Sequence, residues 1–181
     1  FNMSHDIRTP MNAILGFVSL AQNEMDNHEK LLDYLNKIEK SGRHLLDLIN
    51  DVLDMARIES GKIELHEEPF NLEEQFNETV DMFQIDMDRK KLDFKCNLRI
   101  EDKIVNADSL RTKQIMLNLL GNALKYTKEG GTVMFEIKQK TSEKKGLAVY
   151  QIRVKDTGIG MSKEFQKHLF DLFERENRTS V

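Results

Sequence analysis

The 181-residue sequence has one cysteine, two prolines, no tryptophan and no long hydrophobic run. A single cysteine, Cys96, forms no internal disulfide and is too few for a thiolate zinc site, so a disulfide-stapled secreted mini-protein is excluded. No segment approaches the roughly 20 apolar residues of a transmembrane helix, and the first residues lack a signal-peptide pattern. The 27 basic and 31 acidic residues give a net charge of -4, which disfavours nucleic-acid binding. We expect a cytoplasmic globular chain.

Residues 1–61 carry two amphipathic stretches, separated by a polar patch at 26–29. Apolar residues recur every three or four positions in both, as on a helix that packs against other helices. This seam consists of Ile7, Met11, Ile14, Val18, Ala21 and Met25, then Leu31, Leu35, Ile38, Gly42, Leu45, Ile49, Val52 and Ala56. A single antiparallel hairpin cannot also bury Leu15, Phe17, Leu32, Leu46 and Leu53. We therefore predict a two-helix hairpin that dimerises into a four-helix bundle.

Residues 62–181 form a second predicted domain of the α+β class. The helices are expected near 71–89 and 108–127, begun by Asn71 with Glu74 and by Asp108, and a short one after Ser162. Strands are expected near 92–99, 131–140 and 147–156, the last two joined as an antiparallel hairpin by a polar loop. The pattern predicts a mixed sheet covered by helices.

His5 is the first candidate for chemistry. It shares one outward helix face with Arg8, Thr9 and Asn12, opposite the seam. An exposed neutral imidazole offers a ring nitrogen as a nucleophile, and the neighbouring Asp6 could orient it. Pro10 removes a hydrogen bond to the carbonyl of Asp6 and is expected to bend the helix there. The alternative is a solvated surface histidine without function.

The helix near 108–127 carries a polar stripe of residues three or four positions apart. It contains Arg111, Gln114, Asn118, Asn122 and Lys125, opposite Met116, Leu117, Leu120 and Leu124. Asparagine is a poor helix former, but its carboxamide oxygen suits Mg²⁺, and a lysine one turn on supplies charge for phosphates. The stripe is consistent with a site for a metal and a triphosphate, or with a solvated outer face.

Asp156 ends the strand near 147–156 on its core-facing side, so we expect it to be partly buried. The turn that follows it contains Gly158 and Gly160, which let the backbone approach a flat ligand closely. The Asp156 carboxylate could then accept a hydrogen bond from an exocyclic amine of that ligand. A glycine turn that merely ends a strand is the alternative. The Asp-Thr-Gly triplet of aspartic proteases is disfavoured because this chain is mostly helical.

Four segments, in order, resemble the H, N, G1 and F boxes of bacterial sensor histidine kinases. They are 4–10 (SHDIRTP), 118–127 (NLLGNALKYT), 156–160 (DTGIG) and 170–174 (FDLFE). The resemblance implies a dimerisation and phosphotransfer hairpin followed by a Bergerat-type α/β sandwich that binds ATP. It also implies that His5 is the phosphoacceptor, that Asp6 orients it or takes its proton, and that Thr9 positions water for dephosphorylation of a partner.

The same resemblance assigns the nucleotide site. Asn122 would bind Mg²⁺, assisted by Asn118 and Lys125, which also reaches the phosphates. Tyr126 would lie near the nucleotide, Asp156 would bond the adenine amine, and Gly158 and Gly160 would shape the pocket. Phe170 and Phe173 would anchor the lid. The family's second glycine-rich box does not occur before Val181, so we expect weak nucleotide affinity from these residues.

The function implied is ATP-dependent autophosphorylation of His5, followed by transfer to an aspartate of a response-regulator receiver domain. That domain is expected to dock near Asn12, Leu15 and Gly16. A parent protein would be anchored in the inner membrane by segments outside this chain. Two alternatives remain: a catalytically deficient dimeric docking module, and an ATPase that drives conformational change.

Overall fold

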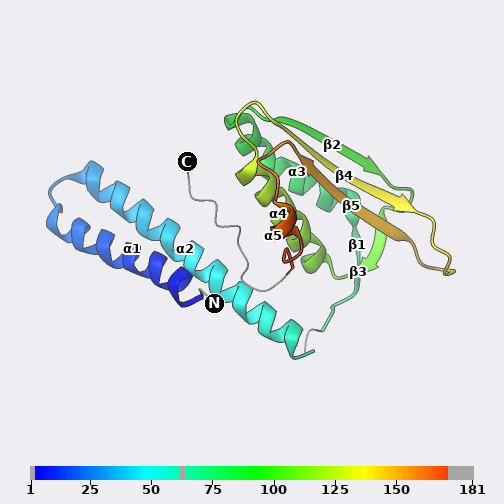
Figure 1. Ribbon diagram of the computed structural model, residues 1–181, viewed down its shortest axis with the longest axis horizontal. Helices are drawn as coiled ribbons and strands as arrows, with labels where there is room; N and C mark the ends of the chain where they lie inside the picture. The colour runs from blue at the N-terminus through cyan, green and yellow to red at the C-terminus, as the bar shows by residue number, and fades with distance from the viewer. Residues whose placement is uncertain (1–2, 62–63, 171–181) are drawn as a thin grey trace. The chain divides into compact units, whose positions relative to one another are not determined.

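The computed structural model of the protein describes residues 3–61 and 64–170 (Figure 1). The chain divides into two compact units. The hairpin unit runs to Glu64 and also includes the described residues from Glu164 onward, and the α/β unit spans Leu65–Lys163. Across these described residues, no helix combines the length and the apolar character needed to cross a membrane.

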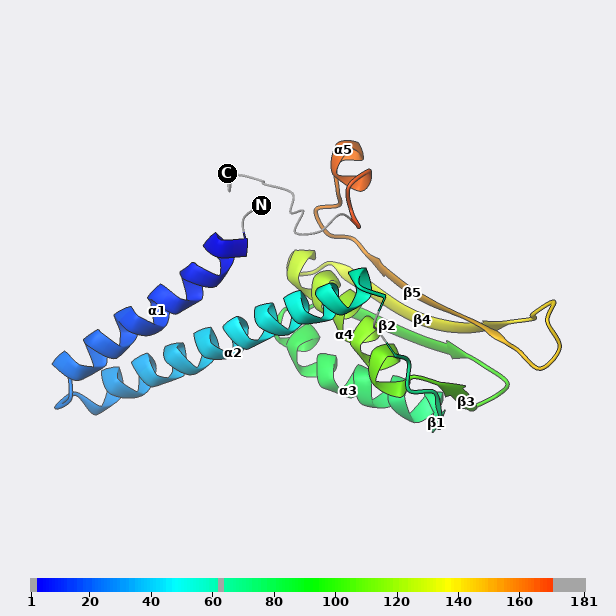
Figure 2. The same cartoon turned by 90° about the horizontal axis from the view of Figure 1, so that it is seen from below.

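The hairpin unit consists of α1 (Met3–Asn23) and α2 (His28–Glu59), which lie side by side in Figures 1 and 2. The side chain of Asn27 begins α2 by accepting a hydrogen bond from the Lys30 amide at 3.1 Å. Such a cap satisfies one of the amide groups left unpaired at a helix start. Between the two helices, the rings of Phe17 and Tyr34 stack with centroids 6.2 Å apart. The predicted hairpin is confirmed.

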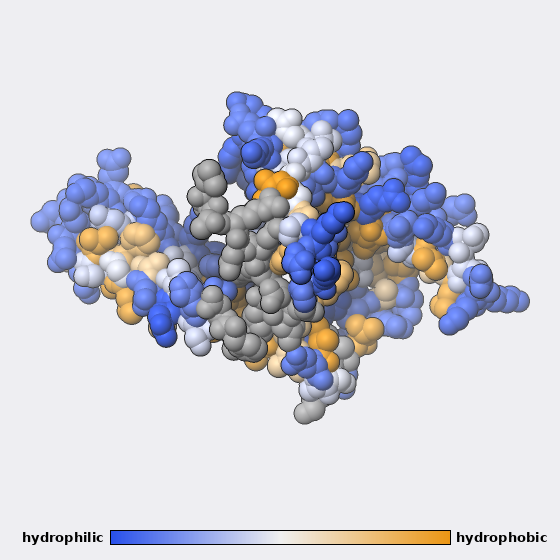
Figure 3. All heavy atoms as spheres, viewed as in Figure 1, coloured by the Kyte–Doolittle hydropathy of each residue, from blue (hydrophilic) through white to orange (hydrophobic). Residues whose placement is uncertain are grey.

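The hairpin buries only part of its predicted apolar seam. Seam residues alternate along each helix: Ile7, Ile14 and Ala21 are buried or half-buried, whereas Met11, Val18 and Met25 between them are exposed. The second helix repeats this, with Leu35 and Ile49 exposed. Hydrophobic groups are visible on the surface of this unit in Figure 3. Part of each seam therefore remains exposed within one hairpin.

The α/β unit contains two sheets and two long helices, and the predicted α+β class is confirmed. Its elements, in order, are β1 (Glu68–Asn71), α3 (Leu72–Arg89), β2 (Asp93–Arg99), β3 (Ile104–Ala107), α4 (Ser109–Tyr126), β4 (Thr132–Lys140) and β5 (Val149–Asp156), before the short α5 (Lys163–Gln166). The larger sheet has the order β2-β4-β5, with β2 parallel and β5 antiparallel to β4. Helices α3 and α4 lie on one side of it (Figure 2).

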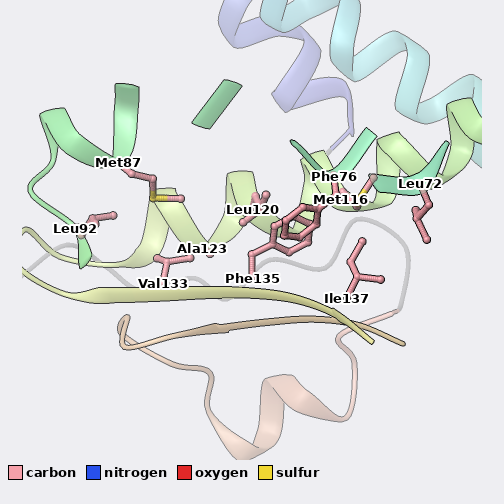
Figure 4. Close-up of a cluster of buried hydrophobic side chains, with 10 residues drawn as sticks. All are labelled: Leu72, Phe76, Met87, Leu92, Met116, Leu120, Ala123, Val133, Phe135 and Ile137. Carbon is pink, nitrogen blue, oxygen red and sulfur yellow. The ribbon is translucent and has the colours of Figure 1, made fainter. Parts of the chain in front are cut away.

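The core fills the space between these helices and the sheet (Figure 4). Val133, Phe135 and Ile137 alternate along β4 and are fully buried, because successive side chains of a strand point to opposite faces. Phe135 stacks on Phe76 of α3 with ring centroids 4.7 Å apart. The opposite face of the sheet carries polar and charged residues. The alternation of apolar and polar residues along β4 therefore determines which face of the sheet packs against α3 and α4.

The sequence analysis found the caps of both long helices in this unit. The Asn71 side chain accepts hydrogen bonds from the amides of Glu73 and Glu74, at 3.1 and 3.3 Å. Asp108 accepts one from the Arg111 amide at 2.9 Å and another from the distant His66 amide at 3.1 Å. These two bonds lower the pKa of the Asp108 carboxyl below its usual value. Asp108 thus starts α4 and ties down the segment that enters the unit.

The second sheet was not predicted. β1 and β3 are four residues each and pair antiparallel, with Glu68 opposite Ala107 and Asn71 opposite Ile104. Pro69 lies within β1, where the sequence analysis saw only a break. Proline is tolerated there because β1 has a single neighbour in its two-stranded sheet.

Candidate functional site

His5 lies in the first turns of α1 on an open face of the hairpin. Its side chain is 69% exposed, and Arg8, Thr9 and Asn12 on the same face are exposed as well. The expected outward placement is therefore confirmed. Pro10 lies inside α1 and is buried.

Two neighbours surround His5. Asp6 is less exposed, at 27%, and its Oδ1 lies 3.7 Å from His5 Nδ1, close enough for an ion pair with a charged imidazole but longer than a hydrogen bond. One turn on, the Thr9 hydroxyl donates to the His5 carbonyl at 3.0 Å. This bond fixes the Thr9 side chain beside the histidine while its oxygen can still accept a hydrogen bond. The three residues of the first motif thus form one exposed cluster.

The polar stripe of α4 divides into two parts. Arg111 and Gln114 are half-buried, and Arg111 donates to the Gln114 carboxamide at 2.8 Å. Asn118, Asn122 and Lys125 are exposed. Within the described residues, the side-chain amides of the two asparagines make no hydrogen bond. Their carboxamides are thus available on the surface, one turn apart.

The turn after β5 packs against the C-terminal end of α4. The Ile159 amide donates to the Tyr126 carbonyl at 3.3 Å. A Cβ on Gly158 would lie 2.6 Å from this same carbonyl oxygen, so only glycine fits there. Gly160 has φ +65°, in the left-handed region that favours glycine. The two glycines therefore bring the third motif against the end of the second.

Asp156 is exposed, and the expectation of partial burial was wrong. Three other residues on the same face of β5 do pack against the core as predicted: Tyr150, Ile152 and Val154. Asp156 is the last residue of β5, an edge strand, and emerges beyond the packed layer. Its Oδ1 accepts a hydrogen bond from the Gly158 amide at 2.8 Å. This bond holds the carboxylate at the turn without burying it.

Three residues that the sequence analysis did not identify also fix this region. Thr157 bonds to the start of β4: its hydroxyl accepts from the Thr132 amide at 2.9 Å. A Cβ on Gly131 would lie 2.5 Å from a methyl group of Thr127, so this turn is closely packed. Lys90 donates to the Leu124 carbonyl at 2.7 Å and caps the end of α4. Of these three features, only the tight turn could have been predicted from the sequence, by its Gly130-Gly131 pair.

The end of α4 also carries a cation beside an aromatic ring. Lys125 Nζ lies 4.9 Å from the centroid of the Tyr126 ring, and both side chains are exposed. Such an arrangement is a weak cation–π contact at an exposed site. Lys125 follows Asn122 by three residues and therefore lies one turn further along the same helix face.

Of the two residues expected in a lid, Phe170 is 92% exposed, and Phe173 lies outside the described residues. Across the described part, no three histidine, cysteine, aspartate or glutamate residues cluster as a metal-binding group would. The available donors are instead the neutral carboxamides of Asn118 and Asn122, which suit a Mg²⁺ ion that keeps most of its ligands from water and phosphate.

Two family models match the chain. The His Kinase A (phospho-acceptor) domain matches residues 2–61, and the histidine kinase-, DNA gyrase B- and HSP90-like ATPase matches residues 107–181. The first includes the His5 cluster, and the second includes α4 and the turn after β5.

Curated relatives match nearly all of the chain. The sensor protein GacS of Pseudomonas syringae pv. syringae is 37% identical over 98% of this chain and 19% of its own length. The signal transduction histidine-protein kinase BarA of Escherichia coli (strain K12) is 36% identical over 96% of this chain and 19% of its own length. The chain thus spans about a fifth of these relatives.

Solved structures agree. Histidine kinase ThkA in complex with the response regulator protein TrrA has a TM-score of 0.70 and 26% identity, over 95% of this chain and 48% of that one. Full-length ShkA in complex with AMPPNP has a TM-score of 0.61 and 30% identity, over 90% of this chain and 34% of that one. The chain belongs to the sensor histidine kinases of two-component systems, and it carries their phospho-acceptor and ATPase segments.

Proposed function

We propose that this chain is the kinase core of its parent protein. Residues 1–61 form the dimerisation and phosphotransfer hairpin, and residues 62–181 form the ATP-binding catalytic domain. The activity is ATP-dependent autophosphorylation of His5, followed by transfer to an aspartate of a response-regulator receiver domain. The observation that carries the proposal is the exposed His5, with Asp6 and Thr9 beside it, in a chain that also matches the ATPase family.

The geometry around His5 supports a different role for each ring nitrogen. Because Asp6 faces Nδ1, Nε2 is the nucleophile. A bond forms between Nε2 and the γ-phosphorus of ATP, the bond from that phosphorus to the β–γ bridging oxygen breaks, and ADP leaves. Asp6 stabilises the proton held at Nδ1 during the transfer. In a separate phosphatase reaction, Thr9 positions the water that attacks the phosphoaspartate of the receiver domain, which releases inorganic phosphate.

The nucleotide site lies at the end of α4 and the turn after β5. Asp156 accepts a hydrogen bond from the adenine amine, and Gly158 and Gly160 leave room for the flat base. Lys125 and Asn118 bind the phosphates, next to Tyr126. Asn122 would hold Mg²⁺, which would neutralise phosphate charge during transfer. Phe170 and Phe173 anchor the lid over the nucleotide.

Dimerisation of the hairpin follows from its apolar surface. Met11, Val18 and Leu35 belong to the helix-packing seam, yet each is 37% to 50% exposed in one hairpin. A second copy would cover them, as in a four-helix bundle. A homodimer is therefore the proposed assembly. No nucleic acid is involved.

The receiver domain docks on the hairpin below His5. Asn12, Leu15 and Gly16 are exposed on α1, and Leu15 is 62% exposed. The related ThkA was solved with a response regulator, which supports a partner of this class. We place the chain in the cytoplasm, where such a partner would meet it, and segments outside this chain would span the inner membrane.

The proposal is tested by incubating the purified protein with Mg²⁺ and γ-labelled ATP, then adding a receiver domain. Label should enter the protein and then pass to the receiver. Asn122→Ala should lose labelling, whereas Asn77→Ala, an exposed asparagine of α3, should retain it. Labelling that is equal in both variants would contradict the nucleotide site.

The alternative is a docking module that binds a receiver domain without catalysis. The intact His5, Asn122 and Asp156 favour the kinase. A wild-type protein that binds a receiver domain, yet neither binds Mg²⁺–ATP nor takes up label, would instead support the docking module.

A further inference from the structure

The outer face of the large sheet is strongly basic. We define the outer face as the side chains of β2, β4 and β5 that point away from the core. The strand pairing places six basic residues on it: Lys95, Arg99, Lys138, Lys140, Arg153 and Lys155. Only two acidic residues, Asp93 and Glu136, share this face. The chain as a whole is acidic, with a net charge of -4, so positive charge is concentrated here.

Both acidic groups of the outer face are already neutralised. Asp93 pairs with Lys95 at 2.9 Å. Glu136 lies 3.8 Å from each of Arg99 and Arg153 and accepts a hydrogen bond from Asn97 at 3.1 Å. By contrast, the exposed ammonium groups of Lys138, Lys140 and Lys155 have no carboxylate partner among the described residues. The face therefore presents unpaired lysines beside a centre in which one carboxylate, Glu136, is shared by two arginines.

One end of the outer face is apolar as well as basic. Leu147, in the turn between β4 and β5, is 62% exposed, and Val149, the first residue of β5, is 48% exposed. The same turn exposes two basic residues, Lys144 and Lys145, and one acidic residue, Glu143. In Figure 3 this turn, at the right of the view, shows hydrophobic groups among hydrophilic ones. Apolar side chains flanked by lysines are typical of segments that enter the interface of an anionic bilayer.

Helix α3, in the layer on the other side of the sheet, is acidic, although α4 in the same layer carries three basic residues and no acidic one. Helix α3 carries six acidic residues and a single basic one, Arg89: Glu73, Glu74, Glu78, Asp81, Asp86 and Asp88. At physiological salt, charges are screened over about 8 Å, so the near layer governs binding to a charged surface. The unit would therefore face an anionic surface with its sheet and hold the acidic helix α3 away from it.

We propose that the outer face of the β2-β4-β5 sheet, with the β4–β5 turn, binds the surface of an anionic lipid bilayer. The lysines favour this occupant over an acidic protein. An ammonium is a point charge that suits a fluid layer of anions, and on this face four lysines outnumber the two arginines, whose planar groups suit fixed bidentate contacts. The exposed Leu147 adds an apolar contact that an acidic protein surface does not need. This inference is independent of the kinase reaction.

The test is sedimentation of the protein with vesicles of phosphatidylcholine, alone or with about a third phosphatidylglycerol. Binding should require the anionic lipid and weaken with salt. Each lysine at such a surface raises the binding affinity roughly fivefold. The double variant Lys138→Gln/Lys155→Gln should therefore weaken binding by roughly 25-fold. Leu147→Ser should weaken it separately without changing the salt dependence.

The matched control is Lys91→Gln/Lys103→Gln, which removes the same charge from lysines paired with Glu129 and Glu73, away from the outer face. It should bind nearly as the wild type does. Absence of binding to anionic vesicles, equal binding to phosphatidylcholine alone, or equal loss in both double variants would overturn the proposal. Binding to polyglutamate but not to vesicles would also overturn it and identify an acidic protein as the occupant.

Discussion

Gly158→Ala tests whether the close contact between the turn after β5 and the end of α4 builds the nucleotide site. The added Cβ would lie 2.6 Å from the Tyr126 carbonyl oxygen and 2.6 Å from Asp156 Oδ1. Ordinary carbon–oxygen contacts exceed 3 Å, and the carbonyl belongs to helical backbone that cannot yield easily. The turn must shift, at a cost of about 1–3 kcal/mol for overpacking.

The same shift should displace the Asp156 carboxylate, which is held by the Gly158 amide at 2.8 Å. We expect the affinity for Mg²⁺–ATP to fall at least about tenfold, equivalent to about 1.4 kcal/mol. The assays are urea unfolding and titration with the nucleotide.

Gly121→Ala is the matched control. Gly121 lies within α4, and a Cβ there would meet nothing within 4 Å. Alanine should stabilise the helix by about 0.5–1 kcal/mol and leave nucleotide affinity unchanged. If the urea midpoint and the nucleotide affinity of Gly158→Ala both equal those of the wild type, the turn does not form the site as described.

The other predictions concern the framework of the α/β unit. Phe135→Ala should destabilise it by about 3–5 kcal/mol, because the fully buried ring stacks on Phe76, and a large drop in the urea midpoint would verify this. Asp108→Asn retains a capping oxygen but not the charge. Because the folded pKa of Asp108 is lowered, its contribution to stability is complete above the ordinary value of 3.8 and is lost as pH falls below it. The wild type should therefore lose stability more steeply than Asp108→Asn as the pH falls below about 3.8, and parallel urea midpoints in that range would argue against this role.

Local signals predicted most of the fold. The periodic seam gave both hairpin helices, and the side chains of Asn71 and Asp108 marked the starts of α3 and α4 because capping depends on neighbouring amides. The pair β1 and β3 was missed because its strands are four residues long and separated by α3 and β2. The pairing depends on contacts between residues far apart in the sequence, which local sequence patterns do not predict.

The site was predicted in part for a similar reason. The outward placement of His5 follows from helix periodicity alone. The predicted burial of Asp156 was wrong. Alternation along a strand tells which face of the sheet a side chain lies on, but not whether another element covers that face at an edge strand. Lys90 and Thr157 act through partners distant in sequence, so their part in holding the end of α4 and the turn could be seen only in three dimensions.

The most direct test of the central claim is the identity of the phosphorylated side chain. After incubation with Mg²⁺ and γ-labelled ATP, the wild type should carry a label that is lost in acid and stable in base, as a phosphoramidate is. His5→Gln should carry none, whereas His44→Gln, an exposed histidine of α2, should be labelled as the wild type is. An unchanged label in His5→Gln would contradict the assignment of His5 as the phosphoacceptor.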